Sequence, residues 1–332
     1  MPTQPSLLDR SEGDDRVLSP TEARLAASTD LDALASVEVL RLLNAQDRVA
    51  VDAVDAVLPQ LAQVVDIAAE RFRRGGVIHY FGAGTSGRLG VLDAAELLPT
   101  FNLEPGRVVG HIAGGERALV HAVEDAEDSD ADGRADAAGI GADDVAIGLA
   151  ASGNTPYVGG ALATARAAGA YTVLISSNPH AALAPLADSN IVLETGAEVL
   201  TGSTRLKAAT AEKLVLNGFS TALMVAVGRT WSNLMVSVVA TNAKLRRRTV
   251  RILQEAAGLD EDDARAVLAA ADGELKTAIV SALAGTDASA SRRLLDDHDG
   301  SVRAALAAAS DIDIHSTDES PPQSTHTEGE SQ

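Results

Sequence analysis

The stretch VIHYFGAGTSGRLGVLDAAE (77–96) indicates the fold, because an apolar run leads directly into a loop rich in glycine and hydroxyl groups and then into a helical pattern. A loop between a strand and a helix favours anion binding, since backbone N–H groups and the positive helix end converge there. Glycines at 82, 84 and 87 match the G-x-G-x-x-G pattern of dinucleotide-binding folds. However, the loop has no lysine, and only Asn102 and Glu104 lie near the place of an acidic ribose ligand.

Four more apolar runs of strand length follow: RVVGHI (107–112), DVAIGLA (144–150), YTVLIS (171–176) and NIVLE (190–194). Several are apolar on both faces, which is typical of parallel strands covered by helices on both sides. Helical patterns at about 87–98, 116–127, 157–169 and 180–187 separate the five runs. The prediction is an α/β fold with a five-stranded, mostly parallel, doubly wound sheet, whose ligand sites form at the carboxyl ends of the strands.

Helical patterns also flank the predicted sheet. Leu31 to Leu42 and about 47–74 have helical spacing, with Pro59 dividing the second helix or opening its second half. Further helices are predicted at about 204–229 and 231–256, then three or four short ones between 260 and 309. The expected organisation is a disordered tail (1–20), N-terminal helices packed on the core (21–74), the sheet domain with its following long helices (75–247), a small helical module (248–309) and a disordered acidic tail (310–332).

Composition narrows the class of protein. The 332-residue chain has a formal net charge of -20 and four lysines, which argues against nucleic acid and anionic membranes as partners. It has no cysteine, and it shows neither a secretory signal pattern nor a membrane-length apolar run, so a cytoplasmic protein is expected. An Asp-rich, Lys-poor surface is typical of proteins from a high-salt cytoplasm, where salt screens dense acidic charge, and suggests a halophilic source.

A second hydroxyl-rich loop, AASGNTP (150–156), follows the third predicted strand. A dinucleotide needs one glycine-rich loop, whereas two Ser/Thr loops suit a compact terminal phosphate on a sugar. The alternative is that both loops are ordinary turns with capping hydroxyls. The predicted phosphate ligands in these loops are Gly84, Thr85, Ser86, Ser152, Asn154 and Thr155.

Two glutamates share apolar stripes in the predicted helices. Glu96 lies seven residues after Leu89 and four after Leu92, and Glu127 stands in the same relation to Val120 and Val123. Desolvation on such a stripe would raise the pKa of a carboxyl, as a general acid at neutral pH requires. The alternative is an acid on a solvated flank.

The sequence has no motif typical of a metal site or of a serine nucleophile. The seven histidines include no H-E-x-x-H spacing, and no G-x-S-x-G nucleophile motif is present, so neither a metal site nor a serine nucleophile is expected. His79 and His111 fall within predicted strands and are expected to be core or edge residues.

From about Thr21 to Leu306 the chain resembles the N-acetylmuramic acid 6-phosphate etherases, a branch of the sugar isomerase (SIS) fold that also includes the glucokinase regulatory protein. The resemblance rests on five ordered blocks, GAGTSGRLGVLDAAE (82–96), IAGGERALVHAVEDAEDS (112–129), AASGNTPYV (150–158), GAEVLTGSTRLKAATAEKLVLN (196–217) and NLMVSVVATNAKL (233–245).

The resemblance implies a carbon-oxygen lyase that cleaves the lactyl ether of N-acetylmuramic acid 6-phosphate without a cofactor, by elimination and then hydration. Glu96 matches the family's proton donor and Glu127 its second active-site glutamate. Ser203, Thr204 and Lys207 become further phosphate-ligand candidates, the alternative for Lys207 being a solvated first-turn lysine. The resemblance also implies a homodimer with its site near the subunit contact.

Some residues depart from the family pattern. Leu97 and Leu98 follow the first glutamate where the family often has Cys-Pro, and Asn154 stands where arginine is expected, so the physiological substrate stays open. Two alternatives remain: a non-catalytic sugar-phosphate sensor, which needs only the phosphate loops, and an aldose-ketose isomerase of the same fold.

Overall fold

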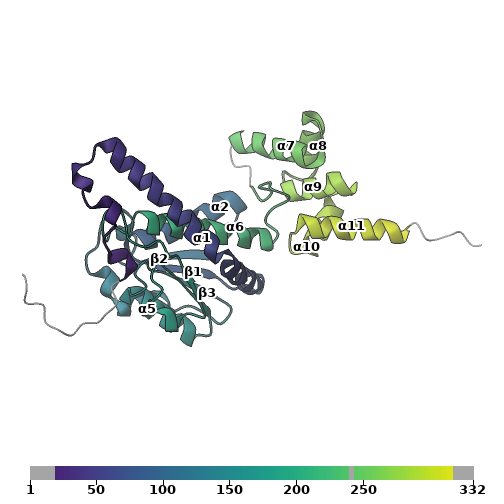
Figure 1. Ribbon diagram of the computed structural model, residues 1–332. Coiled ribbons are helices and arrows are strands. Elements are labelled where there is room, and N and C mark those ends of the chain that lie inside the picture. The colour runs from purple at the N-terminus through teal and green to yellow at the C-terminus, as the bar shows by residue number, and fades with distance from the viewer. Residues whose placement is uncertain (1–18, 239–242, 317–332) are drawn as a thin grey trace, which may run out of the picture. The chain divides into compact units, whose positions relative to one another are not determined.

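The computed structural model describes residues 19–238 and 243–316 (Figure 1). Most of the two predicted disordered tails, and residues 239–242 of the predicted helix 231–256, lie outside the described residues. The chain forms two compact units. Of the described residues, 19–64, 76–92 and 109–218 belong to the first unit, and 65–75, 93–108, 219–238 and 243–316 belong to the second.

The five predicted strands are present in one sheet. They are β1 (Ile78–Gly82), β2 (Val108–Ile112), β3 (Val145–Leu149), β4 (Tyr171–Ser176) and β5 (Ser189–Val192), in the order β2-β1-β3-β4-β5. The pairs β1/β3, β3/β4 and β4/β5 are parallel. Figure 1 shows α5 (Pro156–Ala167) on one side of the sheet and α1 (Ser36–Arg73) and α6 (Lys207–Ala226) on the other. The doubly wound α/β fold is thus confirmed.

Apolar strand residues supply the core of the first unit. Ile78, Phe81, Val145 and Ile147 are at most 1% exposed. His79 and His111 lie in β1 and β2 as predicted, partly buried, with His79 Nδ1 3.1 Å from His111 Nε2. Burial and the neighbouring His111 lower the pKa of His79 to about 4, so this ring is neutral near pH 7.

The N-terminal helices differ from the prediction. Leu31 lies in a short 3-10 turn, and α1 begins only at Ser36, where Glu38 Oε2 accepts a bond from the Ala35 N–H at 2.9 Å. From there α1 is one helix that passes through Pro59, so the predicted division is wrong. Buried Val57, Leu61 and Val64 anchor both sides of the proline, and this packing offsets the hydrogen bond that the proline removes.

Two predicted helices are wrong. The predicted helix 116–127 is reduced to α3 (Arg117–Val120) and a 3-10 turn at Ala126–Asp128, because His121 is extended and Asp125 is left-handed with φ 60°. A helix that the sequence pattern did not indicate, α4 (Asp130–Asp136), follows this turn. The pattern at 180–187 forms only the 3-10 turn Ala184–Leu186. By contrast, α2 (Gly84–Phe101) and α5 form where predicted.

Two glycines let α4 and α5 pack with their backbones in contact. A Cβ on Gly133 would lie 1.9 Å from the Tyr157 carbonyl oxygen, and one on Gly160 would lie 2.1 Å from that of Asp130. The Tyr157 hydroxyl donates to Asp136 Oδ2 at 2.5 Å across the same contact. Helix backbones reach such distances only where a residue lacks a side chain.

Replacing Gly133 with alanine is therefore expected to destabilise the protein. The added methyl group forces α4 away from α5, at a cost of about 1–3 kcal/mol in the free energy of unfolding. Urea unfolding followed by circular dichroism measures this change. Gly139→Ala is the matched control, because nothing lies within 4 Å of its missing Cβ. Equal stability of the two variants would contradict the close packing.

Four short helices lie near the end of the described residues, where three or four were predicted, and the last of them continues past the predicted boundary at 309. They are α8 (Glu261–Ala270), α9 (Leu275–Ala284), α10 (Ala288–Asp296) and α11 (Val302–Ser316), and α7 (Ala243–Ala257) precedes them. The start of the predicted helix 231–256 is wrong, since an isolated bridge pairs Trp231 with Leu234.

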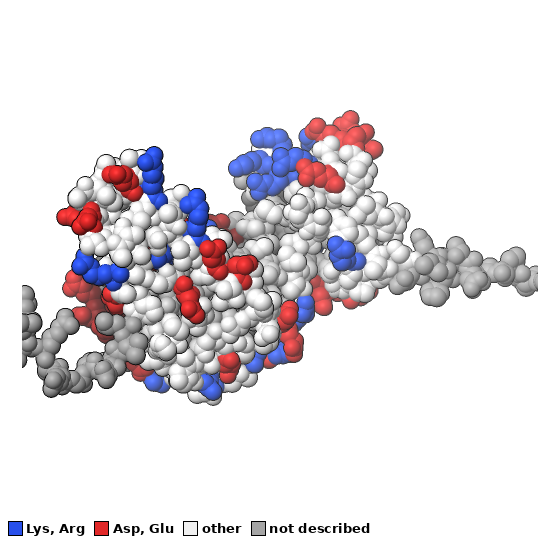
Figure 2. Space-filling model, in the orientation of Figure 1, with Lys and Arg blue, Asp and Glu red and all other residues white. Residues whose placement is uncertain are grey.

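Figure 2 shows basic side chains gathered over α7, which contains the run RRR at 246–248. Among the described residues, no helix is both long and apolar enough to cross a bilayer.

Candidate active site

The loop after β1 forms through close contact between a strand end and a helix start. A Cβ on Gly82 would lie 2.6 Å from the Gly87 nitrogen, so both positions require glycine. Gly84 adopts φ +53° and opens α2. The N–H groups of Gly84, Thr85 and Ser86 therefore belong to the first turn of a helix, where backbone donors have no acceptor within the helix. This end of α2 is suited to hold an anion.

The loop after β3 is braced from behind by residues that follow β4. The Asn178 side-chain amide donates to the Ser152 carbonyl at 2.8 Å, and the Ala182 N–H donates to Asn154 Oδ1 at 2.9 Å. Thr155 is the N-cap residue of α5, but its hydroxyl makes no capping bond, unlike the capping alternative weighed above. The Ser152 hydroxyl accepts from the Asn154 N–H at 3.2 Å.

The two loops leave the same edge of the sheet. β1 and β3 are neighbouring parallel strands, and Gly82 pairs with Leu149 at their carboxyl ends. The first turns of α2 and α5 therefore begin side by side, where open α/β sheets bind their ligands. This arrangement was predicted from the order of strands and loops.

Lys207 occupies a different environment from the one expected. It begins α6 and is only 3% exposed, so the alternative of a solvated lysine is wrong. Its Nζ donates to Gln46 Oε1 at 2.7 Å, and burial lowers its pKa. The carboxylate of the fully buried Glu198 accepts the N–H groups of Lys207 and Ala208 and so caps α6. Ser203 and Thr204 lie in the turn before this helix, partly buried.

Glu212 was not predicted and lies directly behind the first loop. The Ser86 hydroxyl lies 2.8 Å from Glu212 Oε2, and Glu212 Oε1 is buried with no hydrogen-bond partner. Burial raises the pKa of this carboxyl to about 7, and the bond from Ser86 lowers it by less. The signal was present in the sequence, because Ala208, Val215 and Leu216 place Glu212 on a buried stripe of α6.

Replacing Glu212 with glutamine is expected to change how stability depends on pH. The carboxyl holds its proton up to about pH 7 in the folded chain but only to its ordinary value of 4.5 when unfolded. Its contribution to stability is therefore full below pH 4.5 and is lost as pH rises through 7, a loss of about 3 kcal/mol. Urea unfolding at pH 5 and pH 8 should show that Glu212→Gln gains much more stability relative to the parent at pH 8 than at pH 5. Parallel changes at both values would contradict a raised pKa.

The two predicted catalytic glutamates are exposed in the single chain. Glu96 lies on α2, and its neighbours Leu92 and Leu98 are each 50% exposed, so the predicted buried stripe is wrong within one chain. Glu127 lies in the 3-10 turn, and Val120, expected on its stripe, is 79% exposed. Helical periodicity grouped Leu92 with Glu96 on α2, but it does not say what covers that face, and the stripe predicted for Glu127 is not helical.

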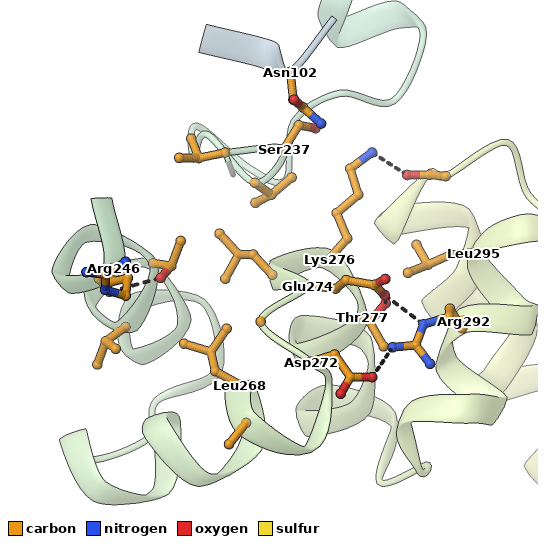
Figure 3. A pocket seen from close by; sticks show the side chains of 18 of the residues that line it. Asn102, Ser237, Arg246, Leu268, Asp272, Glu274, Lys276, Thr277, Arg292 and Leu295 are labelled. Atoms are coloured by element: carbon orange, nitrogen blue, oxygen red, sulfur yellow. Dashed lines mark hydrogen bonds and ion pairs between the residues drawn. The ribbon is translucent and has the colours of Figure 1, made fainter. Parts of the chain in front are cut away.

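A separate cavity of about 870 Å³ lies within the second unit (Figure 3). Its charged side chains are largely held by neighbours. Lys276 Nζ donates to the carbonyl oxygens of Gly228 and Gly300 at 2.9 and 2.6 Å, and burial lowers its pKa to about 8. Arg292 binds both Asp272 and Glu274, as the dashed lines in Figure 3 show. The cavity wall therefore combines apolar side chains with charged groups, several of which are paired with one another or with backbone carbonyls.

Comparison with known proteins shows which families the chain resembles. Residues 60–166 match the model of the glucokinase regulatory protein N-terminal SIS domain. The chain is 57% identical to an N-acetylmuramic acid 6-phosphate etherase of Thermobifida fusca, over 80% of this chain and 88% of the relative. It is 51% identical to one from Streptomyces avermitilis, over 87% and 94%. A solved phosphoheptose isomerase from Francisella tularensis is 16% identical, with a TM-score of 0.45, over 57% of this chain and 98% of that one.

The parallel sheet, its strand order and the domain match define a SIS-fold protein. Sequence identity above 50% to the two etherases, across most of each chain, identifies the family within this fold. The chain belongs to the N-acetylmuramic acid 6-phosphate etherase family.

Proposed function

We propose that the chain cleaves the D-lactyl ether of N-acetylmuramic acid 6-phosphate, giving N-acetylglucosamine 6-phosphate and D-lactate. The observation that carries this proposal is the identity of 57% to a relative named for that activity, over 88% of its length. The loop geometry supports it, because two helix N-termini with Thr85, Ser86, Ser152 and Thr155 begin at one sheet edge and suit a sugar phosphate.

The proposed reaction needs one acid and one base and no cofactor. Glu127 removes the proton at carbon 2, the bond from carbon 3 to the ether oxygen breaks, and Glu96 protonates that oxygen as D-lactate leaves. Glu96 then takes a proton from water, whose oxygen adds to carbon 3 of the unsaturated sugar, while Glu127 gives a proton back to carbon 2. An alkoxide is a poor leaving group, so the acid is the group on which elimination depends most.

A second copy of the chain completes the proposed site. Exposed apolar residues lie beside each glutamate, with Leu92 and Leu98 around Glu96, and Leu119 and Val120 before Glu127. A partner that covers them would desolvate both carboxyls, which a solvated single chain does not. Ten residues of continuous helix separate Ser86 from Glu96, a rise of about 15 Å. We infer that each Glu96 serves a phosphate held by the partner, in a homodimer.

Release of D-lactate tests the proposed function. Purified protein is incubated with N-acetylmuramic acid 6-phosphate, and D-lactate is measured with D-lactate dehydrogenase. Release of D-lactate together with N-acetylglucosamine 6-phosphate is expected. Binding of the sugar phosphate without D-lactate would favour a sensor, and interconversion of aldose and ketose phosphates would favour an isomerase.

We also propose that the acidic surface adapts the protein to high salt, because the chain has 47 acidic and 27 basic residues. Salt screens repulsion between such charges. Unfolding at low ionic strength with recovery in molar salt is expected. Stability that does not respond to salt would exclude this adaptation.

A further inference from the structure

A buried acid behind the first phosphate loop has no role in the reaction proposed above. Glu212 is 3% exposed, and it contacts the loop through the 2.8 Å distance between its Oε2 and the Ser86 hydroxyl oxygen. Its other oxygen is buried and has no partner among the described residues. A carboxylate at this position would present negative charge to the place where a phosphate is expected, so its protonation state decides whether the loop attracts or repels an anion.

No nearby cation neutralises this carboxyl within the described parts of the chain. On its own helix, Lys207 is bound to Gln46 and Lys213 is exposed. From α2, Ser86 faces it, while Arg88 Nε donates to the Leu119 carbonyl at 3.2 Å. Burial and the Ser86 bond are the two causes that act on its pKa, with burial the larger. The neutral acid is therefore the form that this environment stabilises.

The Ser86 hydroxyl donates to Glu212 Oε2 at 2.8 Å, which is the direction that an ionised carboxylate requires. The same distance suits the reverse bond when the carboxyl carries a proton on this oxygen. When Glu212 is ionised, the Ser86 hydrogen must point to the carboxylate, and a lone pair faces the loop. When Glu212 carries a proton, it donates to Ser86 Oγ, and the Ser86 hydrogen is free to point into the loop. One proton thus reverses the hydrogen bond and converts Ser86 from acceptor to donor.

We propose that Glu212 is a positioning residue of the phosphate loop, where, as a neutral acid, it donates to Ser86 and directs the Ser86 hydroxyl hydrogen toward a bound phosphate. This inference rests on the proposed function, because it takes the loop at Ser86 to bind the phosphate of the substrate. Glu212 does not touch the reacting atoms. It controls binding of the phosphate through Ser86.

The test is binding of N-acetylglucosamine 6-phosphate, measured by isothermal titration calorimetry between pH 6.5 and 8.5. The phosphate ester is mostly dianionic above about pH 6, so its own titration changes little in this range. If only the protonated form of Glu212 binds, the Kd of the parent protein rises by about 20-fold from pH 6.5 to pH 8.5. Glu70→Gln, an exposed glutamate on α1, is the matched control and keeps this profile.

Two variants distinguish the effect of the Glu212 charge on binding from the effect of the hydrogen bond that Glu212 donates to Ser86. In Glu212→Gln the amide donates to Ser86 at every pH, so the Kd should stay within about threefold of the parent value at pH 6.5 and not vary with pH. Glu212→Leu should also give a flat profile, but with binding about tenfold weaker, because nothing then orients the Ser86 hydroxyl. Circular dichroism checks that each variant is folded.

Three results would overturn the inference. These are a flat profile in the parent protein, a pH-dependent profile that persists in Glu212→Gln, and equal Kd values for the Gln and Leu variants. In each case D-lactate release by the parent protein leaves the proposed function standing. Failure of the parent both to bind N-acetylglucosamine 6-phosphate and to release D-lactate would instead exclude the proposed function, and the inference with it.

Discussion

Glu96→Gln is expected to lower the rate of D-lactate release by about 10²–10⁴-fold, the usual contribution of a well-placed general acid. Glutamine keeps the size and polarity of the side chain but cannot give a proton to the leaving ether oxygen. Steady-state assays with N-acetylmuramic acid 6-phosphate should show the loss in kcat with little change in KM, because Glu96 is placed away from the phosphate loops. Glu70→Gln, which changes an exposed glutamate of α1, should leave the rate unchanged.

An analogue with chloride at carbon 3 sharpens this result, because chloride leaves without a proton. Glu96→Gln should eliminate chloride at nearly the parent rate while it fails to release D-lactate. Loss of both activities would show that Glu96 does something other than protonate the leaving oxygen. Undiminished D-lactate release would remove Glu96 from the catalytic machinery.

Subunit mixing tests whether Glu96 acts on a phosphate held by the partner. One inactive chain has Glu96→Gln, and the other has Ser86→Ala together with Ser152→Ala. In a mixed dimer one site then combines an intact Glu96 with intact loops, so random mixing should restore about a quarter of the parent activity. If each site lies within one chain, mixing restores nothing.

The sheet could be predicted from the sequence because its information is local. Strands such as VAIGL (145–149) are apolar on both faces, and Gly82 and Gly87 mark the contact between strand end and helix. The predicted helix at 116–127 failed for a local reason as well. Asp125 takes a left-handed conformation that periodicity does not register, so Glu127 lies in a turn instead of on a helical stripe.

The candidate site was harder to predict, because contacts between distant residues determine it. Lys207 was expected at a phosphate since lysine is scarce, yet its ammonium binds Gln46, 161 residues away. Glu96 was expected to be buried because Leu92 lies on the same stripe of the helix. In the single chain, however, Leu92 is 50% exposed. Glu212 follows from the same stripe argument that was applied to Glu96, and its contact with Ser86 links segments 126 residues apart.

Glu127→Gln is expected to abolish proton removal at carbon 2 and to lower D-lactate release by a similar factor of about 10²–10⁴. The amide cannot accept the proton, and no step of the elimination precedes its removal. This variant should therefore fail with both the lactyl ether and the chloride analogue, in contrast to Glu96→Gln. The difference arises because a better leaving group relieves the need for an acid but not the need for a base.

Exchange of the carbon 2 hydrogen with D₂O distinguishes the roles of the two glutamates and does not depend on the leaving group. When N-acetylmuramic acid 6-phosphate is incubated with each variant, Glu96→Gln should let Glu127 exchange the carbon 2 hydrogen for deuterium while the ether stays intact. Glu127→Gln should leave that hydrogen in place, as proton NMR would show. Exchange that is retained in Glu127→Gln and lost in Glu96→Gln would reverse the two roles, because the group that removes the proton must be the one whose loss stops exchange.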